Sequence, residues 1–147
     1  GIDADRIYEE YEEMLAAVKP DVVSVCTPVP THAPIVIDCA ESRTVDAIHC
    51  EKPMADTWKN SQQMAAACEE AGVFLTSNHQ RRFDDSTGQV KELLGKGIIG
   101  RLQKVEFATK NFYDSGSHFV DLCNYFNNEQ DVEWVMGQID YREENVR

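Results

Sequence analysis

The chain has 147 residues, of which 42% are hydrophobic and 27% are charged, a composition typical of a globular protein with a core of its own. Its formal net charge of -12 excludes nucleic acid as a partner, because the phosphates would be repelled. No apolar run is long enough to span a membrane, and five cysteines without a Cys-x-x-Cys pair indicate reduced thiols in the cytoplasm, not a zinc site.

The first half of the chain alternates predicted helices and strands. Residues 5–18 have the periodicity of a helix. Asp5 is placed to cap its start, and Lys19-Pro20 ends it. The apolar run 21–28 predicts a strand of the kind that is buried on both faces of a parallel sheet. A helix over residues 34–41 and a second strand over residues 45–50 follow.

A third helix and a third strand complete this pattern. Asp56 or Thr57 is placed to cap the helix, and Gly72 is placed just after its end. Residues 73–77 form the strand. This alternation with short connections predicts the α/β class, with a doubly wound parallel sheet.

The pattern changes in the second half of the chain. Ser86 and Gln89 have the spacing of a capping box for a short helix. We further expect a strand over residues 102–109, a helix over 117–126 and a strand over 132–141. The domain boundary is placed between residues 83 and 84. The chain opens on a helix without a Gly-x-Gly-x-x-Gly turn and ends just after a strand, so we expect a segment of a longer protein.

Glu51-Lys52-Pro53 follows the second predicted strand directly. In open α/β sheets, ligands bind in the crevice beyond the carboxyl ends of the strands. A lysine held there would direct its ammonium group at the ligand, and Pro53 restricts the backbone that carries it. The alternative is a solvated turn closed by a Glu51–Lys52 salt bridge.

Asp114 and His118 have i, i+4 spacing if a helix begins near Asp114. A histidine held by a carboxylate is a general base, and Asp121 is placed to support it from the other side. Two alternatives stay open. Asp114 is a helix cap and His118 a packed side chain, or Asp114 and His118 bind a metal ion together with His79 or Asp121.

Taken in order, these motifs resemble the glucose-fructose oxidoreductase / inositol dehydrogenase (Gfo/Idh/MocA) family. The resemblance covers nearly the whole chain and rests on five stretches: Thr27-Pro28, His32, Glu51-Lys52-Pro53, Asn78-His79-Gln80-Arg81-Arg82-Phe83 and Asp114-x-Gly116-x-His118-x-x-Asp121. It implies that residues 1–83 are the C-terminal part of a dinucleotide-binding Rossmann domain. Residues 84–147 would then begin an α+β domain with a mostly antiparallel sheet.

The resemblance also implies a role for each site residue. The catalytic residues would be Lys52, Asp114 and His118, with Lys52 positioning the reacting hydroxyl and His118 taking its proton. The cofactor would contact Thr27, Pro28, His32, Glu51, Lys52 and Pro53. The substrate would contact Asn78, Arg81, Arg82, Asp114 and His118. A cis peptide bond is expected before Pro53, and no metal is expected.

The implied function is hydride transfer between NAD or NADP and a hydroxyl or keto group of a sugar or polyol, in a protein that forms a homodimer or homotetramer. Nicotinamide, His118 and Lys52 supply the hydride acceptor, the base and the positive charge that this reaction needs. A catalytically silent sugar- or nucleotide-binding member of the same fold is the alternative. Two departures stand out: the glycine-rich turn is missing, and the connection 40–48 is longer than the family's usual turn.

We expect the 147-residue chain by itself to bind neither NAD nor NADP tightly. The glycine-rich turn and the helix that follows it normally supply the amide donors for the pyrophosphate. Titration calorimetry with each cofactor checks this expectation. A dissociation constant in the low micromolar range would show that no necessary part of the cofactor site is missing.

Overall fold

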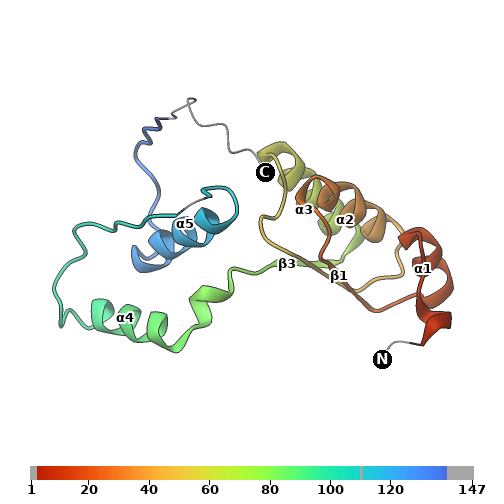
Figure 1. Cartoon of the computed structure of the whole chain (residues 1–147), viewed down its shortest axis with the longest axis horizontal. Coiled ribbons are helices and arrows are strands. Elements are labelled where there is room, and N and C mark those ends of the chain that lie inside the picture. Colours follow the sequence, from red (N-terminus) through yellow and green to blue (C-terminus); the bar gives the residue numbers. More distant parts are fainter. Residues whose placement is uncertain (1–2, 110, 139–147) are drawn as a thin grey trace.

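The computed structural model describes residues 3–109 and 111–138 (Figure 1). Three parallel strands form one sheet in the order β1-β2-β3. Their bounds are Val22–Val25, Ala47–Cys50 and Phe74–Ser77. The sheet and its helices confirm the predicted α/β class, and each strand is shorter than the apolar run that predicted it.

Five α-helices accompany the sheet in the described part of the chain. They are α1 (Tyr11–Val18), α2 (His32–Glu41), α3 (Trp58–Ala71), α4 (Asp85–Gly95) and α5 (Ser115–Phe126). Short 3-10 helices occupy Ala4–Arg6, Val29–Thr31 and Gln80–Phe83. In Figure 1 the chain leaves the sheet through β3 and forms α4 and α5 on the side away from α1.

Helix α3 begins and ends where its sequence predicts. The side chain of Thr57 accepts a hydrogen bond from the backbone N–H of Asn60, which is the N-cap contact. Gly72 follows the helix with a φ of +74°, a left-handed conformation that glycine adopts without a steric penalty. Both helix signals are local, so they could be identified without knowledge of the tertiary structure.

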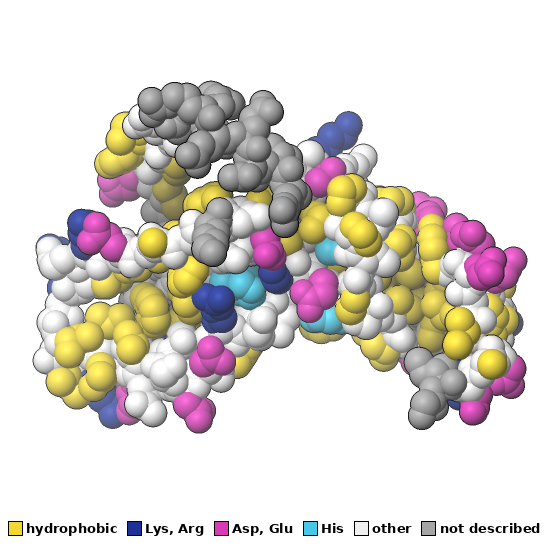
Figure 2. Space-filling view, in the orientation of Figure 1, with side chains coloured by type: hydrophobic (Ala, Val, Ile, Leu, Met, Phe, Trp, Pro, Cys, Tyr) yellow, Lys and Arg dark blue, Asp and Glu magenta, His cyan; other side chains and the backbone are white. Residues whose placement is uncertain are grey.

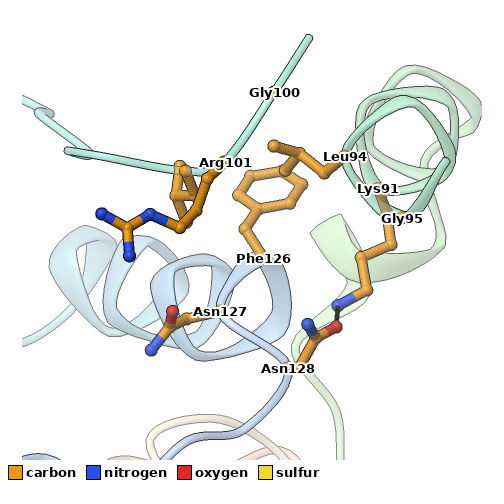
Figure 3. Close-up of a pocket in the computed structure, with 9 residues that line it drawn as sticks. Lys91, Leu94, Gly95, Gly100, Arg101, Phe126, Asn127 and Asn128 are labelled. Atoms are coloured by element: carbon orange, nitrogen blue, oxygen red, sulfur yellow. Dashed lines mark hydrogen bonds between the residues drawn. The ribbon is translucent and has the colours of Figure 1, made fainter. Parts of the chain in front are cut away.

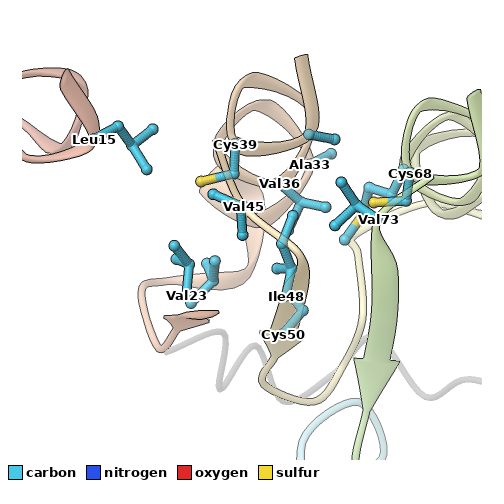
Figure 4. Packing of buried hydrophobic residues seen from close by; sticks show 13 residues of the cluster. Leu15, Val23, Ala33, Val36, Cys39, Val45, Ile48, Cys50, Cys68 and Val73 are labelled. Atoms are coloured by element: carbon cyan, nitrogen blue, oxygen red, sulfur yellow. The ribbon is translucent and has the colours of Figure 1, made fainter. Parts of the chain in front are cut away.

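The core lies between the sheet and the two helices α2 and α3 (Figure 4). Side chains along β1 and β2 alternate, so that Val23, Val25, Ile48 and Cys50 are buried. The other face is open, and Val22 is 64% exposed there. The expectation of a strand buried on both faces is therefore wrong for the described chain. The buried hydrophobic cluster draws all its members from residues 15–73.

Three predicted helix boundaries need correction. The first helix does not run from Asp5: a 3-10 turn is followed by α1, which starts at Tyr11 and places Glu12 and Glu13 in its first turn. Acidic side chains stabilise that end of a helix dipole, which favours the later start. The other two helices start earlier than predicted, α2 at His32 and α5 at Ser115.

The second half contains no strand among its described residues. The predicted strands 102–109 and 132–138 are irregular in structure, and residues 139–141 lie outside the described chain. A strand needs a hydrogen-bonding neighbour, and neither segment has one within residues 3–109 and 111–138. The capping box is also wrong, because α4 begins at Asp85 with Asp84 as its cap.

The sequence also led us to expect reduced cysteines and no membrane-spanning segment. All five cysteines are free, and Cys39, Cys50 and Cys68 are buried in the core. Burial raises the pKa of Cys39 and of Cys50 to about 11, which keeps both thiols protonated at neutral pH. None of the helices in the described ranges has the length and apolar character needed to cross a membrane.

Two glycine substitutions should change stability in opposite directions. Gly72→Ala should lower the free energy of unfolding by about 1–2 kcal/mol, because alanine is strained at this φ. Gly88→Ala, within α4, should raise it by up to about 1 kcal/mol, because alanine favours a helix. Neither new methyl group meets an atom within 4 Å, so packing does not interfere. Denaturant unfolding measures both, and destabilisation by Gly88→Ala would contradict the assigned helix.

Candidate active site

The three parallel strands end side by side at one edge of the sheet. Val25, Cys50 and Ser77 are in register across β1, β2 and β3. This is the edge at which ligands bind in open parallel sheets. The segments that follow the strands meet here, and they contain most of the predicted site residues: 26–31, 51–57 and 78–83.

The buried side chain of His32 connects the segment after β1 to the segment after β2. Its imidazole is 1% exposed, and its Nε2 lies 2.8 Å from the carbonyl oxygen of Thr27. Its Nδ1 lies 3.1 Å from the carbonyl oxygen of Pro53 and 3.3 Å from that of Met54. In this structure His32 therefore supports the edge and does not line it, unlike the neighbouring Thr27 and Pro28, which are exposed.

The segment after β2 carries Lys52 toward α5. The Lys52–Pro53 peptide bond is cis, as the resemblance implied. The carboxylate of Glu51 accepts a hydrogen bond from the backbone N–H of Lys52 at 3.0 Å, so it folds back on its own segment. The ammonium of Lys52 donates to the carboxylate of Asp114, at the start of α5. The predicted Glu51–Lys52 salt bridge is absent from the described ion pairs.

Asp114 pairs with Lys52 and not with His118. The carboxylate makes no cap contact to α5, and no hydrogen bond links it to His118 in the described structure. A lysine ammonium is the stronger partner for a carboxylate, because both groups are charged. The side chain of Lys52 is 17% exposed and that of Asp114 61% exposed. The i, i+4 spacing thus brought Asp114 and His118 to one helix end without making them a hydrogen-bonded pair.

His118 is kept in its neutral form. Burial lowers the pKa of its imidazole, and the positive charges of Lys52 and Arg81 and the ring of His79 lower it further. The charge of Asp114 opposes these effects only in part. Because an ordinary histidine has a pKa near about 6.5, His118 is unprotonated at neutral pH. An unprotonated imidazole is the form that accepts a proton.

Arg82 holds the segment after β3 to α5. Its Nε donates to the Asp121 carboxylate at 2.7 Å, and another guanidinium nitrogen lies 2.8 Å from a Glu129 carboxylate oxygen. The guanidinium also lies over the ring of Tyr125. These contacts raise the pKa of Arg82 and commit its donors to protein groups. Arg82 therefore positions the segment in this structure, and its contact with a substrate stays a prediction.

The other two predicted substrate residues lie nearer the edge. Asn78 follows β3 and is exposed. The guanidinium of Arg81 lies 4.9 Å from the centre of the Phe119 ring, close enough for a cation–π contact. Figure 2 shows histidine, basic and acidic side chains gathered between the sheet and the part that contains α4 and α5.

A shallow groove of about 370 Å³ opens between the segment after β2 and α5. Its lining is mostly apolar and consists of Pro53, His79, Phe112, Tyr113, Ser117, Val120, Asp121 and Asn124. The hydroxyl of Tyr113 donates to the carbonyl of Ala55 at 2.8 Å, which holds the groove's two sides together. Such a lining suits a flat ring with a few polar groups.

Most residues of this groove had no predicted contact with the cofactor or the substrate. Among them, Tyr113 was assigned no role, His79 was considered only as a metal ligand, and Asp121 as a support for His118 or as a metal ligand. His79 gave a usable signal, because it comes two residues after β3, at the same edge as Lys52. Tyr113 gave none, because its contact with Ala55 spans 58 residues of sequence.

A second cavity lies between the ends of α4 and α5 (Figure 3). Its volume is about 340 Å³. The ammonium of Lys91 donates there to the carbonyl of Tyr125 and to the Asn128 side-chain oxygen, which closes the C-terminal end of α5. Since this lysine is committed to protein acceptors and lies away from Lys52, the cavity is a poorer candidate for a site.

The alternative of a metal site receives no support. No group of three or more His, Cys, Asp or Glu side chains within residues 3–109 and 111–138 is arranged to hold a metal ion. Asp114 is engaged by Lys52, and Asp121 is engaged by Arg82. The two carboxylates considered as ligands from the sequence therefore have other partners.

Comparison with known proteins agrees with the fold. Residues 2–79 match the model of an oxidoreductase family with an NAD-binding Rossmann fold. Over 144 residues the chain is 24% identical to the myo-inositol 2-dehydrogenase of Thermotoga maritima, an alignment that covers 88% of the chain and 42% of the relative. Over 96 residues it is 36% identical to the D-apiose dehydrogenase of Paraburkholderia graminis, covering 65% and 25%.

Among solved structures, the chain is similar to the WlbA dehydrogenase of Bordetella pertussis, determined in complex with NADH and UDP-GlcNAcA. The TM-score is 0.68 at 27% identity, and the match covers 80% of the chain and 42% of that structure. The chain thus spans less than half the length of these similar proteins.

The contact between Lys52 and Asp114 predicts an altered titration. Hydrogen bonding and charge from Lys52 lower the pKa of Asp114 below its ordinary value. The contact therefore contributes to stability above the ordinary carboxylate pKa, and the contribution is lost as the pH falls through the lowered pKa. In Lys52→Met the pKa of Asp114 should rise to the ordinary value.

Carbon-detected NMR titration of the side-chain carboxylates measures this change. Lys59→Met, an exposed substitution in the first turn of α3, is the matched control and should leave Asp114 unchanged. An Asp114 pKa that is the same in Lys52→Met and in the unmodified chain would contradict the contact.

Proposed function

The chain belongs to the oxidoreductase family with an NAD-binding Rossmann fold, whose model matches more than half of its residues, and on this premise we propose that it forms the centre of an NAD(P)-dependent oxidoreductase. The reaction transfers a hydride between the nicotinamide and a hydroxyl or keto group of a sugar, a polyol or a related compound. Below, a protein of its relatives' length that contains this chain is called the full-length protein.

One observation carries this proposal. The ammonium of Lys52, just after the carboxyl end of β2, binds the carboxylate of Asp114 at the start of α5, and its charge acts on the imidazole of His118 one helical turn further on. Alcohol oxidation needs a positive group near the oxygen and a base for its proton. The names of the similar proteins, two sugar or polyol dehydrogenases and one dehydrogenase bound to NADH, support the same class of reaction.

The exposed side of the edge is suited to a nicotinamide cofactor. Thr27 and Pro28 are exposed there, and Pro53 and Tyr113 provide apolar surface in the groove. These residues fit the flat, uncharged end of such a cofactor, which supplies a hydride acceptor when it is bound.

The chain's own residues perform the remaining tasks. Lys52 donates a hydrogen bond to the substrate hydroxyl and stabilises the negative charge that develops on its oxygen. His118, unprotonated at neutral pH, takes the hydroxyl proton. Asp114 holds the ammonium of Lys52 in place at the start of α5. The partly apolar groove limits water around the reacting carbon, which strengthens these electrostatic effects.

Further features of the proposal concern the organisation of the protein. The division at residue 83 is supported by the core, since every member of the buried cluster precedes residue 74. The buried free thiols support a reducing compartment such as the cytoplasm. A homo-oligomer is supported by the exposed apolar side chains at residues 132–136, where Val135 and Met136 are each 84% exposed.

Lys52→Met tests the proposal in the full-length protein. The substitution keeps the bulk of the side chain and removes the charge near the developing alkoxide. Turnover of a polyol or sugar substrate, followed through nicotinamide absorbance, should fall by about 10²-fold or more. Cofactor affinity, measured by calorimetry, should change much less.

The exposed Lys59→Met is again the control and should turn over normally. Normal turnover by a folded, cofactor-binding Lys52→Met would remove Lys52 from the chemistry. An unmodified full-length protein that binds cofactor and sugar without any turnover would favour a silent binding protein instead.

A further inference from the structure

Two buried imidazole nitrogens near the site have no hydrogen-bond partner in the described structure. They are Nε2 of His79 and Nδ1 of His118. A buried polar atom without a partner costs free energy, so an unpaired atom of this kind calls for an explanation. The two rings are neighbours, with centroids 5.4 Å apart and planes at 89°.

This separation fits a hydrogen bond between the two rings. Each ring nitrogen lies close to its own centroid, so a donor–acceptor distance of about 3 Å and two ring radii together give a separation of this size. The perpendicular arrangement of the rings is compatible with this bond as well. The N–H and the lone pair both lie in their ring planes, so either ring can turn about the N–H···N direction without breaking the bond.

Asp121 determines which role His79 can take. One carboxylate oxygen of Asp121 lies 3.7 Å from Nδ1 of His79, and the other accepts from Arg82 at 2.7 Å. A carboxylate only accepts, so its charge favours a proton on Nδ1 of His79. In a neutral imidazole the other nitrogen, Nε2, is then an acceptor.

His118 needs a hydrogen-bond acceptor for its Nδ1. Its Nδ1 is the buried unpartnered nitrogen, which leaves Nε2 as the nitrogen available to a substrate. To accept a proton, Nε2 must carry a lone pair, so the single ring proton must sit on Nδ1. That N–H requires an acceptor, and Nε2 of His79 is the unpartnered acceptor beside it.

We propose that Asp121, His79 and His118 form a relay in which Nδ1 of His118 donates to Nε2 of His79, and Nδ1 of His79 is oriented by Asp121. His79 and Asp121 are then positioning residues, because they act through His118 and do not touch the substrate. The inference rests on the proposed function for its catalytic consequence. It replaces Asp114 by Asp121 as the carboxylate that orients the base, while Asp114 serves Lys52.

The surrounding charges are consistent with a neutral relay. Lys52 and Arg81 face His118 from the segments after β2 and β3, and Asp114 faces it from the start of α5. Asp121 lies on α5 itself, with Arg82 bound to it. The cationic neighbours oppose a second proton on His118, so its imidazole retains one N–H and one lone pair.

Histidine-selective ¹⁵N NMR of the full-length protein tests the relay without relying on activity. In the unmodified protein, His118 should carry its proton on Nδ1 and show the downfield proton shift of a hydrogen-bonded N–H. In His79→Phe this shift should be lost. His49→Phe is the matched control, because His49 lies on the open face of the sheet and bonds Thr76; it should leave His118 unchanged.

Kinetics and a conservative rescue distinguish positioning from packing. His79→Phe should lower kcat by about 10- to 100-fold, the range for partners that orient a functional histidine, with a smaller change in KM and a shifted pH profile. His79→Gln should recover most of the rate, because the amide oxygen can accept from His118 while the amide N–H₂ donates to Asp121. A packing role predicts no such recovery.

The outcomes separate this inference from the proposed function. A proton on Nε2 of His118 in the unmodified protein, which needs no variant to detect, would overturn the relay and leave turnover standing. The relay would also be overturned by an unchanged His118 signal in the His79→Phe variant, or by a kcat of the His79→Gln variant no higher than that of His79→Phe. Absence of turnover in the unmodified protein, with the NMR result as expected, would overturn the proposed function alone.

Discussion

The geometry of the site depends on a buried imidazole beneath the sheet edge. His32, at the first position of α2, bridges the carbonyl of Thr27 after β1 and the carbonyl of Pro53 after β2. A neutral imidazole carries one N–H, so His32 donates a hydrogen bond to one of these carbonyl oxygens, and losing that bond would cost free energy. The segment that carries Lys52 is therefore positioned by two strands at once, although the loop itself is short and irregular.

The charged groups around Lys52 and His118 give these two reactive side chains different environments. Lys52 has the carboxylate of Asp114 beside it, whereas His118 is buried among cationic neighbours. The first arrangement keeps the ammonium in place, and the second keeps the imidazole unprotonated. In the proposed relay, the carboxylate of Asp121 is shared with Arg82 and orients His118 through His79.

Local patterns predicted the first half of the chain well and the second half poorly. The cap at Thr57, the turn at Gly72 and the three apolar strands are encoded in a few neighbouring residues each, so they could be read in order. The segments 102–109 and 132–138 alternate like strands but lack a neighbouring strand in the described structure. Alternation shows which residues could share a face of a sheet, whereas pairing depends on another segment being present.

By itself, the sequence determined the alternating α/β order and placed Lys52 at the carboxyl end of a strand, because periodicity and strand ends are properties of consecutive residues. Only the tertiary structure decided the partners: Asp114 with Lys52, Arg82 with Asp121, and the ring of His79 beside that of His118. These contacts join residues 39 to 62 positions apart. At such separations a charged side chain pairs with the strongest partner within its reach. Which partners are within reach depends on how the strands and helices pack.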